Sequence, residues 1–165
     1  MTNETTNTTS ITTPSDTEIR MEREFDAPRQ LVWEAYTDPE LLGQWLGPHD
    51  HPVTVTHSDL RPGGSYRWTS PGYGDEELEF YGEYREVSPP EVLEATFEFG
   101  GAPGKVSVDR LVLEELEGGR TRLVTTSTFD SKEDRDGMLQ SGMEKGVVEG
   151  HEKLDALLER LGGRS

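Results

Sequence analysis

The sequence predicts an α+β domain in which a curved, seven-stranded antiparallel sheet packs against one long C-terminal helix. Three observations support this class. Seven segments have the alternation and composition of strands, six of them follow one another with short turns, and apolar residues recur every three or four positions from Leu139 to Leu161. Strands joined by short turns pair antiparallel, because parallel neighbours need a long crossover.

Residues 1–16 are expected to form a disordered tail. They contain seven threonines and, after the first Met, a single Ile. Such a segment buries too little apolar surface to offset the entropy of ordering. The domain is therefore expected over residues 17–161, with a short tail at 162–165.

The first strand is expected over residues 18–25, where apolar and charged residues alternate and Arg23 is the polar residue on the inner face. Two short helices should follow it. Asp26 is a candidate cap for the first helix, and Asp38 with Pro39 is typical of the start of the second. Gly47-Pro48 is expected to end that helix.

Six further strands are separated by Gly- and Pro-containing turns. The sequence Glu117-Gly118-Gly119-Arg120 is typical of a tight hairpin. These strands are expected near residues 53–60, 64–70, 77–87, 91–99, 105–117 and 120–129.

The last predicted element is one amphipathic helix. Its apolar face is formed by Leu139, Met143, Val147, His151, Leu154, Leu158 and Leu161. One helix cannot fill a strongly curved sheet everywhere, which raises the question of a cavity between them. Gly142, Gly146 and Gly150 lie along the edge of this face. Each weakens the helix by roughly 1 kcal/mol relative to Ala, and they either leave room for a ligand or allow close packing.

The segment Asp26–Pro48, with the sequence DAPRQLVWEAYTDPELLGQWLGP, resembles the SRPBCC (START-like) superfamily. The similar branch is named after the activator of heat-shock protein 90 ATPase homologues. The resemblance continues through RPGG at 61–64, GEYREV at 82–87, PPE at 89–91 and SGMEKG at 141–146, and so covers about 17–161. It implies the helix-grip fold and a hydrophobic ligand cavity under the last helix. Val147 stands where this family commonly has Trp.

Composition excludes several function classes. The chain has 16 Lys and Arg against 33 Asp and Glu, a net charge of -17, which disfavours nucleic acids and anionic membranes as partners. It has no Cys, so disulfides and thiolate sites are excluded. Neither a signal-like N-terminus nor a membrane-length apolar run is present. We therefore expect a cytoplasmic acidic protein, a monomer or weak homodimer, without a cofactor.

The candidate ligand-binding residues are mainly aromatic side chains at strand spacing, a pattern that also fits an ordinary core. Trp45, Trp68 and Tyr84 stand out because each has a polar group that needs a partner when buried. The candidates are Arg23, Trp45, Tyr66, Trp68, Tyr84, Phe97, Met143, Val147 and His151.

Chemically active groups are few. His49-Asp50-His51 lacks a third protein ligand, so no metal site is predicted. His151, on the apolar face of the last helix, is either a hydrogen-bonded core residue or a ligand contact and weak candidate general base. Arg23 could bind an acidic ligand group or pair with an inward Glu.

Two function classes remain open. The first, which the resemblance implies, is a non-enzymatic protein that binds a small apolar or amphipathic molecule. The second is a cyclase or aromatase-type enzyme that acts on a hydrophobic substrate in the same cavity, with His151, Arg23 and tyrosines as its acid/base groups. A co-chaperone-like ATPase activator rests on the name of the similar family alone. The identity of the ligand stays open.

Overall fold

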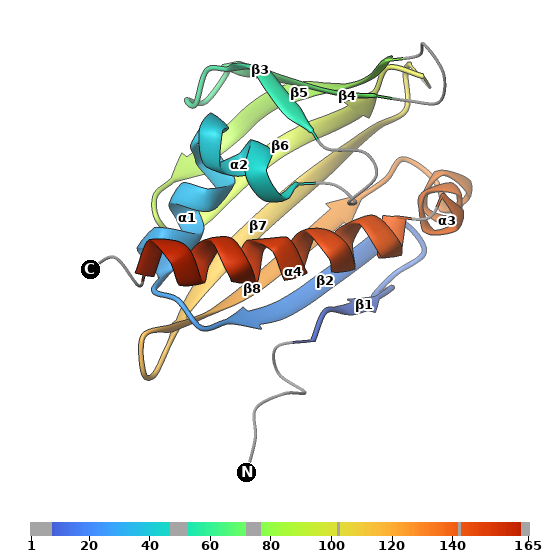
Figure 1. Cartoon of the computed structure of the whole chain (residues 1–165). Helices are drawn as coiled ribbons and strands as arrows, with labels where there is room; N and C mark the ends of the chain where they lie inside the picture. The colour runs from blue at the N-terminus through green and yellow to red at the C-terminus, as the bar shows by residue number, and fades with distance from the viewer. Residues whose placement is uncertain (1–7, 47–52, 72–76, 102, 142, 163–165) are drawn as a thin grey trace.

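The computed structural model describes residues 8–46, 53–71, 77–101, 103–141 and 143–162. Within them, eight strands form one antiparallel sheet in the order β1-β2-β8-β7-β6-β5-β4-β3, and the strands curve around helix α4 (Figure 1). The predicted α+β helix-grip class is thereby confirmed. The elements are β1 Ser10–Thr12, β2 Glu18–Phe25, α1 Arg29–Thr37, α2 Pro39–Trp45, β3 Thr54–Ser58, β4 Ser65–Pro71, β5 Glu77–Ser88, β6 Val92–Phe99, β7 Val106–Leu116, β8 Arg120–Thr128, α3 Lys132–Gln140 and α4 Met143–Gly162.

The seven predicted strands correspond to β2–β8, and their ends agree within two residues. The tight hairpin between β7 and β8 is also confirmed. Gly118 and Gly119 both have positive φ, 74° and 73°, a backbone conformation that glycine adopts without steric cost and that suits the twist of a two-residue hairpin.

The N-terminal segment differs from the prediction. Ser10–Thr12 forms an additional edge strand, β1, which pairs antiparallel with β2 through Ser10↔Glu22 and Thr12↔Arg20. The expectation of a disordered tail is therefore wrong for these residues, while residues 1–7 lie outside the described part of the chain. Backbone hydrogen bonds along the free edge of β2 order this polar segment without a hydrophobic face.

The two short helices are present, but only one has the expected cap. The Asp38 carboxylate accepts a hydrogen bond from the Glu40 amide at 3.0 Å, with Pro39 as the first residue of α2. By contrast, α1 has no side-chain cap. Asp26 instead forms an ion pair with Arg120 at 2.8 Å, which ties the end of β2 to β8. Gly47-Pro48 lies outside the described residues.

The predicted single C-terminal helix is two helices. Leu139 belongs to α3, and α4 begins at Met143. The Ser131 hydroxyl accepts a hydrogen bond from the Asp134 amide at 3.1 Å and so caps α3. Gly142, between the two helices, lies outside the described residues, as do the last residues 163–165.

The hydrophobic core occupies one end of the space under α4. Helices α1 and α2 pack there against the C-terminal half of α4, with β7 and β8 beneath them. The fully buried side chains include Phe25, Val32, Leu113, Leu123 and Leu154. The N-terminal half of α4 covers the other end. None of the helices in the described residues is long and apolar enough to cross a membrane.

Candidate ligand cavity

A cavity of about 490 Å³ lies between the N-terminal half of α4 and the inner face of the sheet. This volume is typical of sites for small molecules, which occupy about 300–1,000 Å³. Strands β2 and β4–β8 form its floor, α1 and α2 close one side, and Met143, Gly146, Val147, Gly150 and His151 from α4 cover it. Most of the lining side chains are apolar.

The structure brings eight of the nine candidate residues to this cavity. They are Trp45, Tyr66, Trp68, Tyr84, Phe97, Met143, Val147 and His151. The sequence left open which of the adjacent Phe80 and Tyr81 points inward. Phe80 lines the cavity, whereas the Tyr81 hydroxyl is 3.4 Å from the Glu98 carboxylate. That these side chains contact a ligand stays a prediction.

Arg23, the ninth candidate, is absent from the cavity wall. Its guanidinium donates two hydrogen bonds of 2.6 Å to the two carboxylate oxygens of Asp155 on α4. It also lies over the Phe25 ring, 4.7 Å from the ring centroid. Arg23 is only 7% exposed, so its charge lies in the core, where the ion pair with Asp155 compensates it. Of its two predicted roles, pairing with a carboxylate is observed, and that carboxylate comes from the helix.

Aromatic rings from three neighbouring strands form a continuous wall. Tyr66 lies 5.0 Å from Trp68 and 5.4 Å from Tyr84, measured between ring centroids, and Trp68 lies 6.2 Å from Phe97. The Tyr66 side chain passes across β5 at Gly82. A Cβ atom at this position would lie 2.0 Å from the Thr96 carbonyl oxygen and 2.8 Å from the Tyr66 hydroxyl. Glycine at this position therefore lets Tyr66 donate its hydrogen bond to Thr96.

The three aromatic residues with polar groups differ in their hydrogen bonding. The Trp45 indole N–H donates to the Ala35 carbonyl at 2.9 Å, and the Tyr84 hydroxyl is 2.9 Å from the Ser58 hydroxyl. The Trp68 indole nitrogen is buried without a hydrogen-bond partner among the described residues. Trp45 and Tyr84 are thus positioned by the protein itself.

His151 is a neutral, hydrogen-bonded residue of the cavity wall. Its Nδ1 lies 2.7 Å from the Thr9 hydroxyl, and its ring makes an edge contact with Phe25 at 5.5 Å. Burial, with a smaller contribution from the nearby charge of Arg23, lowers the pKa of His151 to about 3. An imidazole with such a pKa is a poor general base near neutral pH, because catalysis favours a pKa close to the working pH.

Asp109 is a cavity residue that the sequence analysis missed. It lies on β7, opposite Ser127 on β8 and Ala95 on β6, and it faces the cavity. Burial raises the pKa of Asp109 to about 6, and a hydrogen bond from Ser127 partly opposes this shift. The signal was the alternation Ser107, Asp109, Leu111, Leu113, which puts the carboxylate on the same strand face as two core residues.

The remaining ionisable residues of the cavity wall are tyrosines, and they are neutral near physiological pH. Burial raises the pKa of Tyr36, Tyr66 and Tyr84 above the usual value. Among the described residues that line the cavity, there is no Lys or Arg, and Asp109 is the single carboxylate.

The described residues contain no group of three His, Cys, Asp or Glu side chains that could hold a metal ion. The pair His49 and His51, considered above as a metal site, lies outside these residues.

Comparison with known proteins relates most of the chain to one family. The model of the family described as "Activator of Hsp90 ATPase homolog 1-like protein" matches residues 26–159. No curated protein matches the sequence.

Solved structures resemble this one over nearly the full chain. A crystal structure of a Mycobacterium smegmatis protein has a TM-score of 0.81 and 30% identity, covering 90% of this chain and 95% of that one. An NMR structure of an Arthrobacter aurescens protein has a TM-score of 0.83 and 30% identity, covering 92% and 91%. A Rhodobacter sphaeroides crystal structure has a TM-score of 0.85 and 27% identity, covering 92% and 99%.

Proposed function

This chain belongs to the family of activator of Hsp90 ATPase homolog 1-like proteins, and we propose that it binds a small apolar or amphipathic molecule under α4 without converting it chemically. The family and its fold support a ligand-binding or related function in general. The observation that carries the specific proposal is the cavity of about 490 Å³ with its mostly apolar wall.

The physical reason to expect an apolar occupant is the packing of the cavity. Protein interiors are normally close-packed, and unfilled apolar space forfeits contacts. A ligand that leaves water for this wall gains roughly 25 cal/mol per Å² of buried apolar surface. Gly146, Val147 and Gly150 provide the space for it, because all three are small residues of α4 that face the cavity.

The candidate residues have distinct roles in this proposal. Tyr66, Trp68 and Phe97 form a rigid aromatic surface for the apolar body of the ligand. Met143 and Val147 cover the ligand from α4, where the flexible Met side chain adapts to its shape. Trp45, fixed by its hydrogen bond to Ala35, closes the side towards the core.

One observation favours a second candidate function, an enzyme of the cyclase or aromatase type. Asp109 lies inside the cavity with a pKa of about 6, which suits a general acid or base near neutral pH. Such an enzyme would lose turnover in the Asp109→Asn variant while still binding substrate. A binding protein would release every bound compound unchanged.

The binding proposal is tested by changing the volume of the cavity. Nile red, a neutral apolar dye, should bind the wild-type protein with an increase in fluorescence. The Val147→Trp variant should bind it at least about tenfold more weakly, whereas Val147→Ala, the matched control, should bind it as well as the wild type. Denaturant unfolding of both variants establishes that each is folded.

The stability of Val147→Trp provides a second measure of the empty space. Overpacking a filled core costs about 1–3 kcal/mol, so a loss below about 1 kcal/mol is expected if the new ring enters the cavity. Equal dye binding by the two variants with an intact fold would contradict the proposal.

A further inference from the structure

We propose that the molecule bound in this cavity carries a protonated amine, whose ammonium group pairs with Asp109 while its apolar body lies against the aromatic wall. This inference rests on the proposed binding function and specifies the chemical class of the ligand.

Asp109 lies on the floor of the cavity. Ser127, Asp109, Ala95 and Tyr84 form a row across β8, β7, β6 and β5, in register from strand to strand, and all four line the cavity. The two direct neighbours of Asp109 in this row are therefore small. Ser107, two residues earlier on β7, is also small and also lines the cavity.

The helix side of the cavity is open as well. Gly146 and Gly150 of α4 both line the cavity, so the helix presents little side-chain volume at these two positions. The strand row around Asp109 and these two helix positions thus contribute little side-chain volume to the cavity.

The described cavity wall contains no Lys or Arg that could pair with Asp109. Arg23, the buried cation of β2, is occupied by Asp155 at 2.6 Å, and Lys105, on the loop before β7, pairs with Asp134 at 2.8 Å. His151 is neutral because its pKa is lowered to about 3. Within the described part of the chain, Asp109 forms a hydrogen bond with Ser127 and no ion pair.

An ionised carboxylate in an apolar cavity is costly unless an opposite charge and hydrogen-bond donors compensate it. An ammonium group supplies both, with up to three N–H donors directed at acceptor oxygens. A ligand of this class would therefore satisfy the one group in the described cavity wall that the protein itself leaves without a charged partner.

Aromatic side chains lie close to the Asp109 carboxylate. Tyr84 lies in the same strand row as Asp109, and Tyr66 is close enough for the Asp109 charge to help raise the pKa of the Tyr66 hydroxyl. Cations are attracted to the faces of aromatic rings. The net charge of -17 further favours cations over anions near the protein.

The groups that face the cavity from each element determine the pH dependence. They are Tyr36 from α1, Tyr66 from β4, Tyr84 from β5, Asp109 from β7 and His151 from α4, with the Arg23–Asp155 ion pair next to His151. Between pH 5 and 8, Asp109 is the member of this set that changes charge, because its pKa is about 6 while His151 is already neutral and the tyrosines are still protonated.

Three compounds with the same apolar body test the inference: phenylbutylamine, phenylbutanol and phenylbutyrate. Isothermal titration calorimetry at pH 7.5 should give the affinity order amine, alcohol, acid. We expect the amine to bind at least about tenfold more tightly than the alcohol, as a charge-assisted hydrogen bond requires. At pH 5 this advantage should fall by about tenfold, because about one-tenth of the Asp109 carboxyl groups are then ionised, while binding of the alcohol stays constant.

Two variants identify the residue responsible. Asp109→Asn should remove the preference for the amine and retain alcohol binding within about threefold. Glu114→Gln removes the same charge from an exposed position of the same strand and should leave the preference unchanged. If Asp109→Asn does not fold, the pH dependence of the wild-type protein still decides.

The possible failures are distinct. Alcohol binding without a preference for the amine would overturn this inference and leave the proposed function standing. A preference for the amine that persists in Asp109→Asn would also overturn it, since another group would then be responsible. If neither of these compounds nor Nile red binds, both the inference and the proposed function are wrong.

Discussion

The guanidinium of Arg23 on β2 and the carboxylate of Asp155 on α4 are joined by two parallel hydrogen bonds of 2.6 Å. The Arg23 side chain is 6% exposed and that of Asp155 41%, so the pair spans the boundary between the core and the solvent. It fixes the long helix to the strand next to the free edge of the sheet, close to His151 and the cavity.

The Asp155→Ala variant should be clearly destabilised. It leaves the Arg23 charge buried without its partner. For a fully buried pair, this loss typically costs about 3–5 kcal/mol. Because Asp155 is partly exposed, we expect a loss of about 2–3 kcal/mol here. Urea unfolding measures this difference. Glu159→Ala, an exposed position on the same helix, is the control and should change stability by less than about 0.5 kcal/mol. Equal stabilities of the two variants would show that the ion pair is not structural.

Deletion of residues 2–16 should lower the melting temperature by several degrees. The deletion removes the β1–β2 pairing, the contact of Thr9 with His151 and the hydrogen bond from Arg135 to the Ser15 carbonyl at 2.6 Å. At roughly 2–4 °C per kcal/mol for a protein of this size, even a modest loss is measurable by calorimetry. Thr9→Val isolates one contact and should cost about 0.5–1.5 kcal/mol. An unchanged melting temperature after the deletion would mean that the segment does not dock in solution.

Removing the charge of Asp109 should stabilise the protein at neutral pH. Its pKa is raised from 3.8 to about 6 on folding, so the folded state binds the proton more tightly than the unfolded state, and stability is lost as the pH rises through about 6. Asp109→Asn should therefore gain about 1–3 kcal/mol at pH 7.5, and the gain should vanish near pH 4. Chemical denaturation at both pH values, with Glu114→Gln as control, measures it. A destabilised variant at pH 7.5 would indicate that the ionised carboxylate has a favourable partner.

Regular alternation made most of the sheet predictable. In β2, apolar and charged residues alternate except at Arg23, and in the β7–β8 hairpin two successive glycines mark the turn. The three-residue strand β1 has no such pattern, because its pairing depends on backbone hydrogen bonds along the edge of β2, which any sequence can form. Asp26 was a reasonable cap by residue type, but it pairs instead with Arg120 at the start of β8, a strand that is far away in sequence and adjacent to β2 in the sheet.

The candidate site was predictable in its aromatic part. Trp68, Phe97 and Tyr84 lie where strand alternation places them, and Val147 and His151 follow the helical repeat. The role of Arg23 could not be predicted, because Asp155 approaches it only through the tertiary fold. Asp109 was missed because the surrounding strand has valines at 106, 108 and 112 on the other face, so hydrophobicity alone did not identify which face is inner.

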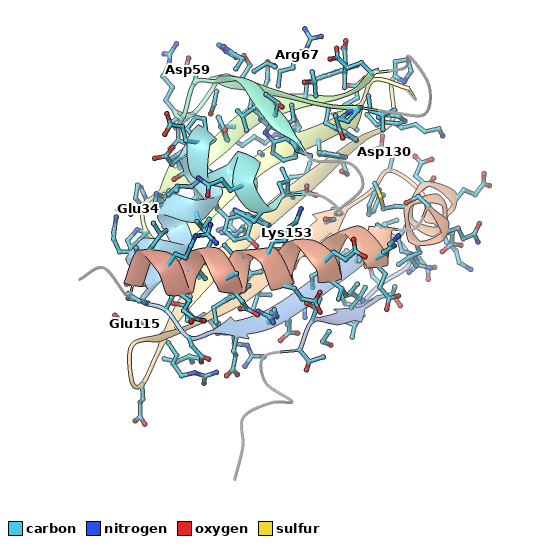
Figure 2. The ribbon with its side chains drawn as sticks, viewed as in Figure 1. Glu34, Asp59, Arg67, Glu115, Asp130 and Lys153 are labelled. Atoms are coloured by element: carbon cyan, nitrogen blue, oxygen red, sulfur yellow. The ribbon has the colours of Figure 1, made fainter. Side chains whose placement is uncertain are left out.

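The charged side chains that dominate the composition lie mainly on the surface. Figure 2 shows Asp59, Arg67 and Glu115 at the rim of the molecule, away from the space under α4. Several of these charges form exposed ion pairs, such as Arg67 with Glu79 at 2.6 Å, and pairs of this kind contribute little to stability. The protein is thus highly charged on its surface, whereas Asp109 is the single carboxylate among the described residues of the cavity wall.

A methyl NMR titration of the wild-type protein with phenylbutanol tests small-molecule binding under α4 most directly. We expect the signals of Met21, Met138, Met143 and Val147, which line the cavity, to shift together and saturate with one dissociation constant. The signals of Leu113 and Leu157, in the packed core, should stay nearly constant. Shifts confined to methyl groups outside the cavity, or no saturable shift at the four cavity residues, would contradict the claim that this protein binds a small molecule under α4.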